Sequence, residues 1–354
     1  MKHRFARGSG LAALSLALAV AAPHAAPAQA LVAPTGYTAQ NVFGTNAGIG
    51  GFDVADDGSI VMILGSGGYG SPSSSLVRWD PADNSFTTLH TFSDSPFGDF
   101  VEVIGNTAYF GQSGVFGDSL SETNRIMSIG LDGTGFTTNL ILQNYTAAQD
   151  AAGRLFFTGN PNSNGVFLVS GSGTNRIVEM PTYSGGLAFA TNGDLYVAQA
   201  TAGFQNNLFR FTHAQVSNAI ALGVALQPTD GIQVGTNFAG SSYLAADSDS
   251  DIFFPDFSGN LYAYDAASGT VSAFGSVTGG MFAAVGILQF DDDAGAFEAF
   301  TADSGTLYAL LSDYGNGSFN QIWAISAIPE PGALATFAAA LLGIAIARRR
   351  RRSA

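Results

Sequence analysis

The sequence predicts an all-β fold, a β-propeller of six four-stranded blades, with seven blades as the alternative. Three observations predict this fold. The chain contains an internal repeat, with copies spaced 40–57 residues apart. Each copy holds short apolar strands, and the strands are separated by turns rich in glycine, asparagine and aspartate. Short strands within a repeat of this length are typical of propeller blades.

The repeat is clearest where two segments align almost column by column, GGFDVADDGSIVMI from Gly50 and GGLAFATNGDLYVA from Gly185. Each contains two glycines, an apolar strand, a turn that ends in glycine, and a second strand. The same turn recurs at six anchor positions, which are Gly58, Asn106, Gly153, Gly193, Ser250 and Gly305. A third strand of alternating polarity, typical of half-buried strands, follows each turn. These strands are expected at 74–80, 124–130, 164–170, 206–212, 259–265 and 320–326.

The two ends of the repeat array are expected to meet in one blade. The last copy has no fourth strand before Pro329, and the N-terminal segment TAQNVFG at 38–44 has no blade of its own. We expect this segment to complete the sixth blade, which would close the ring and leave no open sheet edge. The fourth copy is irregular, and its segment HAQVSNAIALG at 213–223 is expected to form a helical insertion.

Residues 1–30 are predicted to be a secretory signal peptide, exported through the Sec translocon. Lys2, Arg4 and Arg7 precede an apolar run, and Ala28-Gln29-Ala30 is an A-x-A cleavage pattern. Cleavage is expected after Ala30. Residues 31–328, which lie between this leader and the C-terminal segment 329–354, are called the propeller body below. An uncleaved anchor helix is the alternative.

The C-terminal segment at 329–354 has three parts, a Pro-Glu-Pro motif, sixteen residues at 332–347 without charge or amide, and five arginines. Sixteen helical residues span roughly 24 Å, short of the ~30 Å hydrocarbon core, and clustered arginines hold their end in the cytoplasm. The three parts in this order resemble the PEP-CTERM sorting signal of Gram-negative bacteria. The matching residues are Pro329, Glu330, Pro331, Arg348, Arg349, Arg350, Arg351 and Arg352.

This resemblance implies a route rather than an activity. It implies an intermediate anchored in the inner membrane by a transmembrane helix at 332–347, recognition by an exosortase near the Pro-Glu-Pro motif, and release to the cell surface or extracellular matrix. Proteins with this signal share only the tail, so their bodies differ widely. The alternative is a plain stop-transfer anchor.

The propeller body is strongly acidic. It holds 26 acidic residues and five arginines, without lysine or cysteine, which gives a net charge of −21. Such a surface repels nucleic acid and anionic lipid head groups, so a nucleic-acid partner is not expected. The lack of cysteine excludes disulfides, thiol catalysis and cysteine–zinc sites.

No catalytic motif stands out, because the body has only His90 and His213, each without a recognisable partner motif. The repeat rhythm resembles the NHL and gluconolactonase-like propellers. That resemblance implies a divalent metal at the channel, held by acidic and amide side chains from separate blades. The inner-strand candidates are Asp53 and Glu102, and the repeat columns supply no complete ligand set.

A second candidate cation site is the run Asp247-Ser248-Asp249-Ser250-Asp251, which places carboxylates at Asp247, Asp249 and Asp251. Oxygen ligands at this spacing can converge on Ca²⁺ when the chain forms a loop. However, Ile252 replaces the glycine that an EF-hand needs, and Ser258 replaces its final glutamate. A solvated turn is the competing interpretation.

Two classes of function follow. The first is an exported, exosortase-sorted propeller at the cell surface or in the matrix, a non-enzymatic binding or structural component associated with exopolysaccharide. The alternative is a metal-dependent hydrolase or lactonase of the gluconolactonase-like type. The sorting tail and the missing catalytic motifs favour the first.

Overall fold

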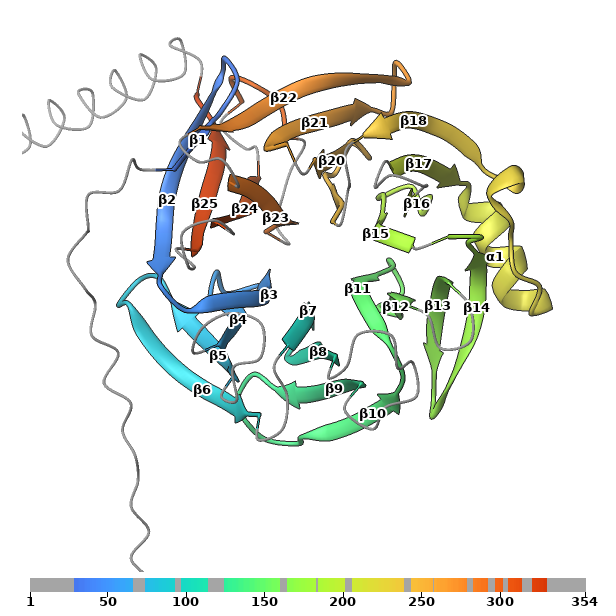
Figure 1. Cartoon of the computed structure of the whole chain (residues 1–354), viewed down its shortest axis with the longest axis horizontal. Helices are drawn as coiled ribbons and strands as arrows, with labels where there is room; N and C mark the ends of the chain where they lie inside the picture. Colours follow the sequence, from blue (N-terminus) through green and yellow to red (C-terminus); the bar gives the residue numbers. More distant parts are fainter. Residues whose placement is uncertain are drawn as a thin grey trace, which may run out of the picture.

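Six sheets surround a central axis in the computed structural model, which is a six-bladed β-propeller (Figure 1). Within the residues described below, five sheets have four antiparallel strands and one has five, so the prediction of six blades is confirmed. The structure describes residues 29–65, 74–92, 97–113, 124–159, 164–182, 184–200, 206–238, 243–256, 258–278, 283–291, 297–301, 305–313 and 320–329.

Along the chain, strands are added from the axis outward in each blade, except that the N-terminal strands β1 (Ala30–Val32) and β2 (Tyr37–Thr45) form the outer strands of blades 5 and 6. Blade 1 comprises β3 (Gly48–Val54), β4 (Ile60–Gly65), β5 (Ser74–Asp80) and β6 (Ser85–Thr91). Blade 2 comprises β7 (Phe97–Ile104), β8 (Thr107–Ser113), β9 (Arg125–Gly130) and β10 (Thr137–Ile141). Blade 3 comprises β11 (Asn144–Gln149), β12 (Leu155–Gly159), β13 (Gly165–Ser170) and β14 (Gly173–Glu179).

The second half of the ring follows the same plan. Blade 4 comprises β15 (Ser184–Phe189), β16 (Leu195–Ala200), β17 (Asn206–Phe211) and β18 (Ile232–Phe238). Blade 5 comprises β19 (Ala245–Ala246), β20 (Ile252–Pro255), β21 (Asn260–Asp265), β22 (Thr270–Thr278) and β1 (Ala30–Val32). Blade 6 comprises β23 (Ala283–Phe290), β24 (Thr306–Asp313), β25 (Asn320–Ala327) and β2 (Tyr37–Thr45).

Strand β2 closes the ring, as the sequence predicts. It pairs antiparallel with β25 from Tyr37↔Ala327 to Thr45↔Asn320 and forms the outer strand of blade 6. The Tyr37 ring lies at the junction of blades 5 and 6, where its centroid is 5.1 Å from that of Phe274 and its hydroxyl donates to the Phe297 carbonyl at 2.6 Å. Strand β1, which we did not predict, adds a fifth strand to blade 5 by pairing with β22.

The recurring turn of the repeat has a single hydrogen-bond pattern in four blades. The first residue donates its N–H to the carbonyl of the fifth, as in Ala55 to Ser59 at 2.9 Å and Asp247 to Asp251 at 3.1 Å. The fourth residue has a positive φ, which glycine adopts without steric cost. These residues are Gly58 (φ 78°), Gly153 (φ 70°), Gly193 (φ 84°) and Ser250 (φ 73°), which explains four of the six anchors.

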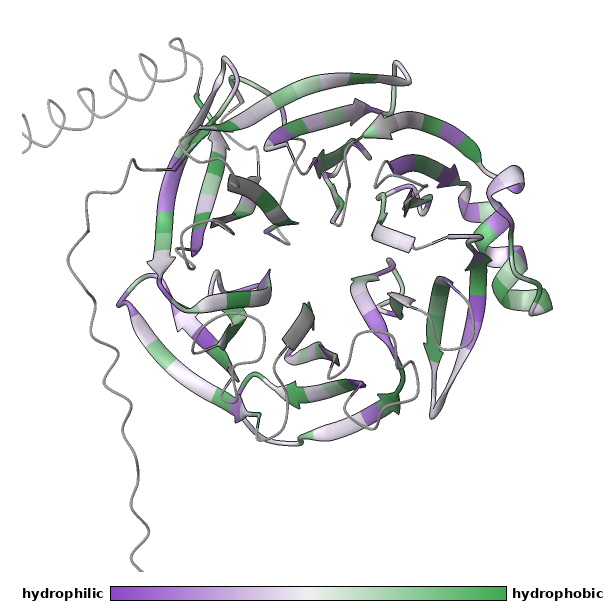
Figure 2. Ribbon diagram, viewed as in Figure 1, coloured by the Kyte–Doolittle hydropathy of each residue, from purple (hydrophilic) through white to green (hydrophobic). Residues whose placement is uncertain are grey.

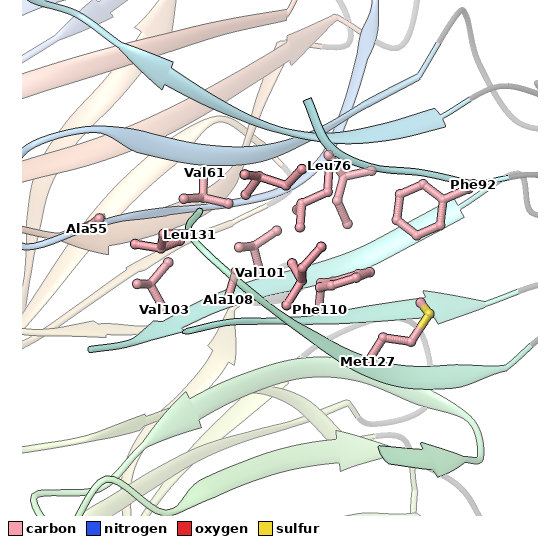
Figure 3. Close-up of a cluster of buried hydrophobic side chains, with 13 residues drawn as sticks. Ala55, Val61, Leu76, Phe92, Val101, Val103, Ala108, Phe110, Met127 and Leu131 are labelled. Carbon is pink, nitrogen blue, oxygen red and sulfur yellow. The ribbon is translucent and has the colours of Figure 1, made fainter. Parts of the chain in front are cut away.

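Each junction between blades contains its own apolar cluster among the described residues. Between blades 1 and 2, Val61 and Leu76 face Val101, Phe110 and Met127, and all five are almost fully buried (Figure 3). Strand β4 contributes Val61 and Ile63 to this cluster and Ile60 and Met62 to the cluster between blades 6 and 1, so both faces of blade 1 are apolar at this strand. Figure 2 shows hydrophobic and hydrophilic residues along the strands of all six blades. Burial of apolar surface between sheets therefore holds the ring together, in a chain without disulfides.

Glycines 51 and 186 mark the closest approaches between inner strands. A Cβ atom on Gly51 would lie 2.6 Å from the backbone carbon of Phe100 in blade 2. A Cβ atom on Gly186, its counterpart in the repeat, would lie 2.7 Å from the Cα of Tyr243 at the start of blade 5. The second glycine of each pair in the repeat is thus required by contact with the next blade.

The helical insertion is confirmed as α1 (His213–Leu222) between β17 and β18. Thr212 accepts the N–H of Gln215 at 3.4 Å as the N-cap, and Gly223 ends the helix with φ 66°. Val216 and Ala219 pack into the cluster between blades 3 and 4. A short 3₁₀ turn, η1 (Pro228–Asp230), leads back to the sheet.

The predicted signal peptide and the predicted sorting tail lie mostly outside the described residues. This holds for residues 1–28, for Glu330 and Pro331, for the segment 332–347 and for the arginines that follow it. Among the helices in the described stretches, none is long and apolar enough to cross a membrane. The signal peptide and the sorting tail stay predictions.

Candidate functional site

A cavity of about 170 Å³ lies on the propeller axis and is lined by residues from all six blades. Its walls are the innermost strands β3, β7, β11, β15, β19 and β23, together with Tyr243 and Leu244 just before β19. Most lining side chains are apolar, and the described residues of the lining include no arginine, lysine or histidine. The polar side chains other than Tyr243 are Asp53, Glu102, Thr146, Gln149 and Gln289.

One position of the repeat differs in polarity between the two halves of the ring. The strand pairings place Asp53, Glu102 and Gln289 in one structural column, since their partners Val61, Tyr109 and Tyr308 occupy matching positions in the second strands. The same column holds alanine in the other three blades, at Ala148, Ala188 and Ala245. At this column, blades 6, 1 and 2 present polar side chains and blades 3, 4 and 5 present alanine, while Thr146 and Gln149 of blade 3 line the cavity at other positions.

Both predicted carboxylates of the cavity bond to the backbone of the following blade. Asp53 Oδ2 accepts the N–H of Val103 at 2.6 Å, and its Oδ1 accepts the N–H of Val54 at 2.9 Å. Glu102 Oε1 accepts the N–H of Gln149 at 2.8 Å. Asp53 and Glu102 are each only 7% exposed. The two residues therefore link blade 1 to blade 2 and blade 2 to blade 3. A hydrogen bond of this kind, between a side chain of one blade and the backbone of the next, is called a tie below.

Similar polar ties occur at the other four junctions. Thr146 Oγ1 donates to the Gly185 carbonyl at 3.4 Å, and Thr191 Oγ1 donates to the Ser248 carbonyl at 2.7 Å. Asp247 Oδ2 accepts the N–H of Phe297 at 3.1 Å, and Gln289 Nε2 donates to the Phe52 carbonyl at 3.5 Å, which connects blade 6 to blade 1. Sequence reasoning missed Thr146, Thr191 and Gln289, although Gln289 shares the column of Asp53.

The tie through Asp53 gives a stability prediction. In Asp53→Ala, the N–H of Val103, a residue 1% exposed, loses its carboxylate acceptor, and an unsatisfied buried donor costs about 1–3 kcal/mol. We expect chemical denaturation of the propeller body to report a loss of that size. Asp56→Ala, at an exposed position of the adjacent turn, is the matched control and should change stability by less than about 0.5 kcal/mol. Equal effects of the two substitutions would contradict the tie.

The predicted calcium run forms the turn between β19 and β20. Asp247 Oδ1 accepts the N–H groups of Asp249 at 3.0 Å and Asp251 at 2.9 Å. Asp150 does the same in its own turn, accepting the N–H groups of Ala152 and Arg154, both at 3.0 Å. Asp251 Oδ1 accepts the N–H of Ala266 at 2.8 Å, and Asp249 is exposed. Capping of a repeated turn accounts for the position of Asp247 without a cation.

The donor set for a metal can be judged from these contacts. Within the part of the chain that the structure describes, no group of three or more histidine, aspartate or glutamate residues is arranged to hold a metal ion. The five predicted ligands lie in two separate places, Asp53 and Glu102 at the axis and Asp247, Asp249 and Asp251 in the turn after β19. A metal site at either place stays a prediction that the observed contacts do not favour.

The turn between β19 and β20 also predicts that the stability of the fold depends on pH. Burial raises the pKa of Asp251 above its ordinary value of 3.8, and the charges of Asp247, Asp265 and Asp249 act in the same direction against the hydrogen bond from Ala266. The folded state thus binds this proton more readily than the unfolded chain, so the group stabilises the fold below about pH 3.8 and loses that contribution as pH rises through the folded pKa.

We therefore expect Asp251→Asn to raise the melting temperature at neutral pH, because asparagine keeps the acceptor for Ala266 but carries no charge. The gain should shrink as pH falls toward the ordinary pKa, where the wild-type carboxyl is also neutral. Melting curves of the wild type and of Asp251→Asn, measured from neutral pH down to the ordinary pKa of aspartate, test the expectation. Asp83→Asn is the control, since hydrogen bonds from Ser85 lower the pKa of this exposed group and the substitution should bring no gain. A difference between Asp251→Asn and wild type that is constant with pH would refute it.

Both histidines of the body serve packing or turns. The His90 ring stacks on Phe136, with centroids 4.3 Å apart and planes 5° apart. The backbone N–H of His213 donates to Asp194 Oδ1 at 2.7 Å, at the start of α1. Asp194 also binds Arg210, which lies 2.7 Å away, so this carboxylate joins a blade turn to the helix.

Comparisons with solved structures agree with the fold. A provisionally assigned glucose dehydrogenase-type oxidoreductase from Thermus thermophilus superposes with a TM-score of 0.55 at 11% identity, over 82% of this chain and 100% of that chain. The PQQ-bound aldose sugar dehydrogenase from Streptomyces coelicolor gives 0.52 at 11% identity, over 83% and 100%. A provisionally assigned gluconolactonase gives 0.52 at 12% identity, over 84% and 98%.

At these identities the likeness establishes a shared fold. No family model matches the chain. No curated protein matches it either.

Proposed function

We propose that this protein is an exported propeller that acts at the cell surface or in the extracellular matrix of a Gram-negative bacterium, as a non-enzymatic binding or structural component associated with exopolysaccharide. Its route would run through the Sec translocon and an inner-membrane intermediate to an exosortase. The observation that carries the non-enzymatic part is the use of both cavity carboxylates as ties between blades. Asp53 and Glu102 each accept a backbone N–H of the following blade.

The lining of the cavity supports this proposal in a second way. The quinone cofactor named for the Streptomyces relative is a tricarboxylic acid, and an anion of that kind needs cationic partners. Among its described residues, the lining of this cavity offers two carboxylates and no arginine, lysine or histidine. Sugar oxidation through that cofactor is therefore not the function that this site favours.

A metal-dependent hydrolase or lactonase is the second candidate. Two observations favour it, the shared fold with a provisionally assigned gluconolactonase and the presence of Asp53 and Glu102 in one axial cavity. Against it stand the hydrogen bonds that already engage both carboxylates. A site of this type would have to break these ties when the metal binds, and Asp53→Ala would then remove activity as well as stability.

Binding and turnover can be separated on one preparation of the propeller body. We expect it to co-sediment with exopolysaccharide from the producing cells, to contain less than one equivalent of divalent metal after dialysis, and to leave a panel of lactones and phosphoesters unchanged. An unrelated acidic protein of similar isoelectric point controls for charge effects. Stoichiometric metal with lactone turnover would replace this proposal by the hydrolase, and failure to bind polysaccharide in any salt condition would count against a matrix role.

The sorting tail makes its own prediction. Replacing Pro329, Glu330 and Pro331 by alanine should trap the protein in the inner membrane with its C-terminal arginines intact, because the processing enzyme would lose its recognition motif. Cell fractionation and intact mass measure this result. Pro81→Ala, in an exposed turn of the body, is the control and should leave sorting unchanged. If the triple variant reaches the surface as wild type does, the tail is not a sorting signal.

A further inference from the structure

Gln29 has an unusual environment for a terminal polar residue. It precedes β1 and is only 6% exposed. Within the described part of the chain, neither its side-chain Nε2 nor its Oε1 has a hydrogen-bond partner. Buried polar groups in folded proteins nearly always find a partner, so an unpartnered primary amide calls for an explanation. Gln112 Nε2 also lacks a partner among the described residues, but Gln29 differs from Gln112 because it lies beside the expected cleavage site.

The sequence before β1 contains two overlapping A-x-A patterns, Ala26-Pro27-Ala28 and Ala28-Gln29-Ala30. The structure separates their consequences. Ala30 is the first residue of β1 and pairs with Thr278, whose Oγ1 donates to the Ala30 carbonyl at 3.4 Å. Cleavage after Ala30 would remove this pair and place a charged amine on Leu31, which is 5% exposed. Cleavage after Ala28 keeps β1 whole and makes Gln29 the first residue.

A glutamine at a free N-terminus can cyclise without a cofactor or an oxidant. The α-amine attacks the side-chain carbonyl carbon, a C–N bond forms, the bond to the amide nitrogen breaks, and one ammonia molecule leaves. The product, pyroglutamate, is a neutral five-membered lactam. It lacks the Nε2 donor and the positive α-ammonium group, which are both costly to bury unpaired, and it keeps the side-chain carbonyl oxygen and one ring N–H.

We propose that Gln29 is a modification site: the leader is removed after Ala28, Gln29 cyclises to pyroglutamate, and this neutral ring is the residue buried at the start of β1. The proposal rests on the export route proposed above. It refines the cleavage point expected from the sequence by two residues.

The composition of the chain gives a sharp test. Lys2, in the leader, is the only lysine of the sequence, so an exported protein that begins at Gln29 has a single amine, the α-amine itself. We expect the unfolded, exported wild-type protein to take up no label from an amine-reactive ester. Gln29→Asn is the matched variant, because asparagine keeps the amide but would need a strained four-membered ring to cyclise. It should take up one label per chain.

Mass spectrometry of the chymotryptic peptide that ends at Tyr37 identifies the terminus directly. We expect a peptide from residue 29 that is lighter than its linear synthetic counterpart by one ammonia, and that pyroglutamyl aminopeptidase converts to one starting at Ala30. A peptide that starts at Leu31, or a linear Gln29 with one label per chain, would overturn the proposal and leave the export route standing. A retained leader would overturn the export route as well.

Discussion

Removal of residues 31–47 is expected to abolish the cooperative unfolding transition of the propeller body. This deletion takes away β2, whose register with β25 runs from Tyr37↔Ala327 to Thr45↔Asn320. It also removes Phe43, whose ring lies 5.0 Å from that of Trp79 in blade 1. Each lost hydrogen bond contributes about 1 kcal/mol, and the ring would be left with an unpaired edge at β25 that favours aggregation. Calorimetry and size-exclusion chromatography of residues 48–328 measure the loss.

A rescue experiment distinguishes closure from a general truncation effect. A synthetic peptide covering residues 31–47 can add to the exposed edge of β25 as a strand, as peptides do at other open sheet edges. We expect it to restore a cooperative transition and a monomeric elution volume in the truncated protein, whereas a scrambled peptide should not. If residues 48–328 melt within a few degrees of the intact body, β2 does not close the ring in any energetic sense.

The second large effect is expected from the paired glycines of the repeat. In Gly51→Ala the new Cβ would meet backbone atoms of Phe100 and Val101 at 2.6–2.7 Å, and in Gly186→Ala it would meet the backbone of Tyr243 at 2.7–2.8 Å. Backbone cannot rotate away as a side chain can, so blades would have to move apart. Overpacking of this kind typically costs about 1–3 kcal/mol per site, and more where the backbone must shift.

Because Gly51 and Gly186 lie at different junctions, their effects on the free energy of unfolding should add within about 0.5 kcal/mol in the double variant. Gly173→Ala is the control, since a Cβ there would meet only the Ser170 carbonyl oxygen at 3.8 Å. Urea denaturation of the wild type and the four variants gives the comparison. A Gly51→Ala protein as stable as Gly173→Ala would mean that the inner strands can separate without cost.

The blade plan could be predicted from the sequence because each copy of the repeat records a local requirement. Glycine at positions 58, 153 and 193 reflects a positive φ, and the second glycine of each pair reflects contact with the next blade. The closing strand was predictable by elimination, since one blade lacked a strand and one strand lacked a blade. Strand β1 was not, because three residues carry too little pattern to indicate which edge they join.

The candidate site was less predictable than the fold. Alignment of the repeat copies identified Asp53 as a candidate metal ligand. The alignment could not distinguish a carboxylate that binds a metal from one that accepts a backbone N–H of the following blade. That distinction depends on the spacing between blades, which no local pattern encodes. The same limit applied to Asp247, where a regular spacing of carboxylates was equally consistent with cation binding and with capping of a turn.

On the export route proposed above, closure by β2 has a consequence for the order in which the strands pair. Tyr37 pairs with Ala327, so β2, which leaves the translocon early, waits for β25, the last strand of the propeller body. Contacts of such long sequence separation form slowly, and until then β25 presents a free edge to its surroundings. A periplasmic chaperone that binds unfolded chains would act at this stage, before β2 has paired with β25. A tail that keeps the C-terminus in the bilayer would hold the incompletely closed propeller at the membrane until the two strands pair.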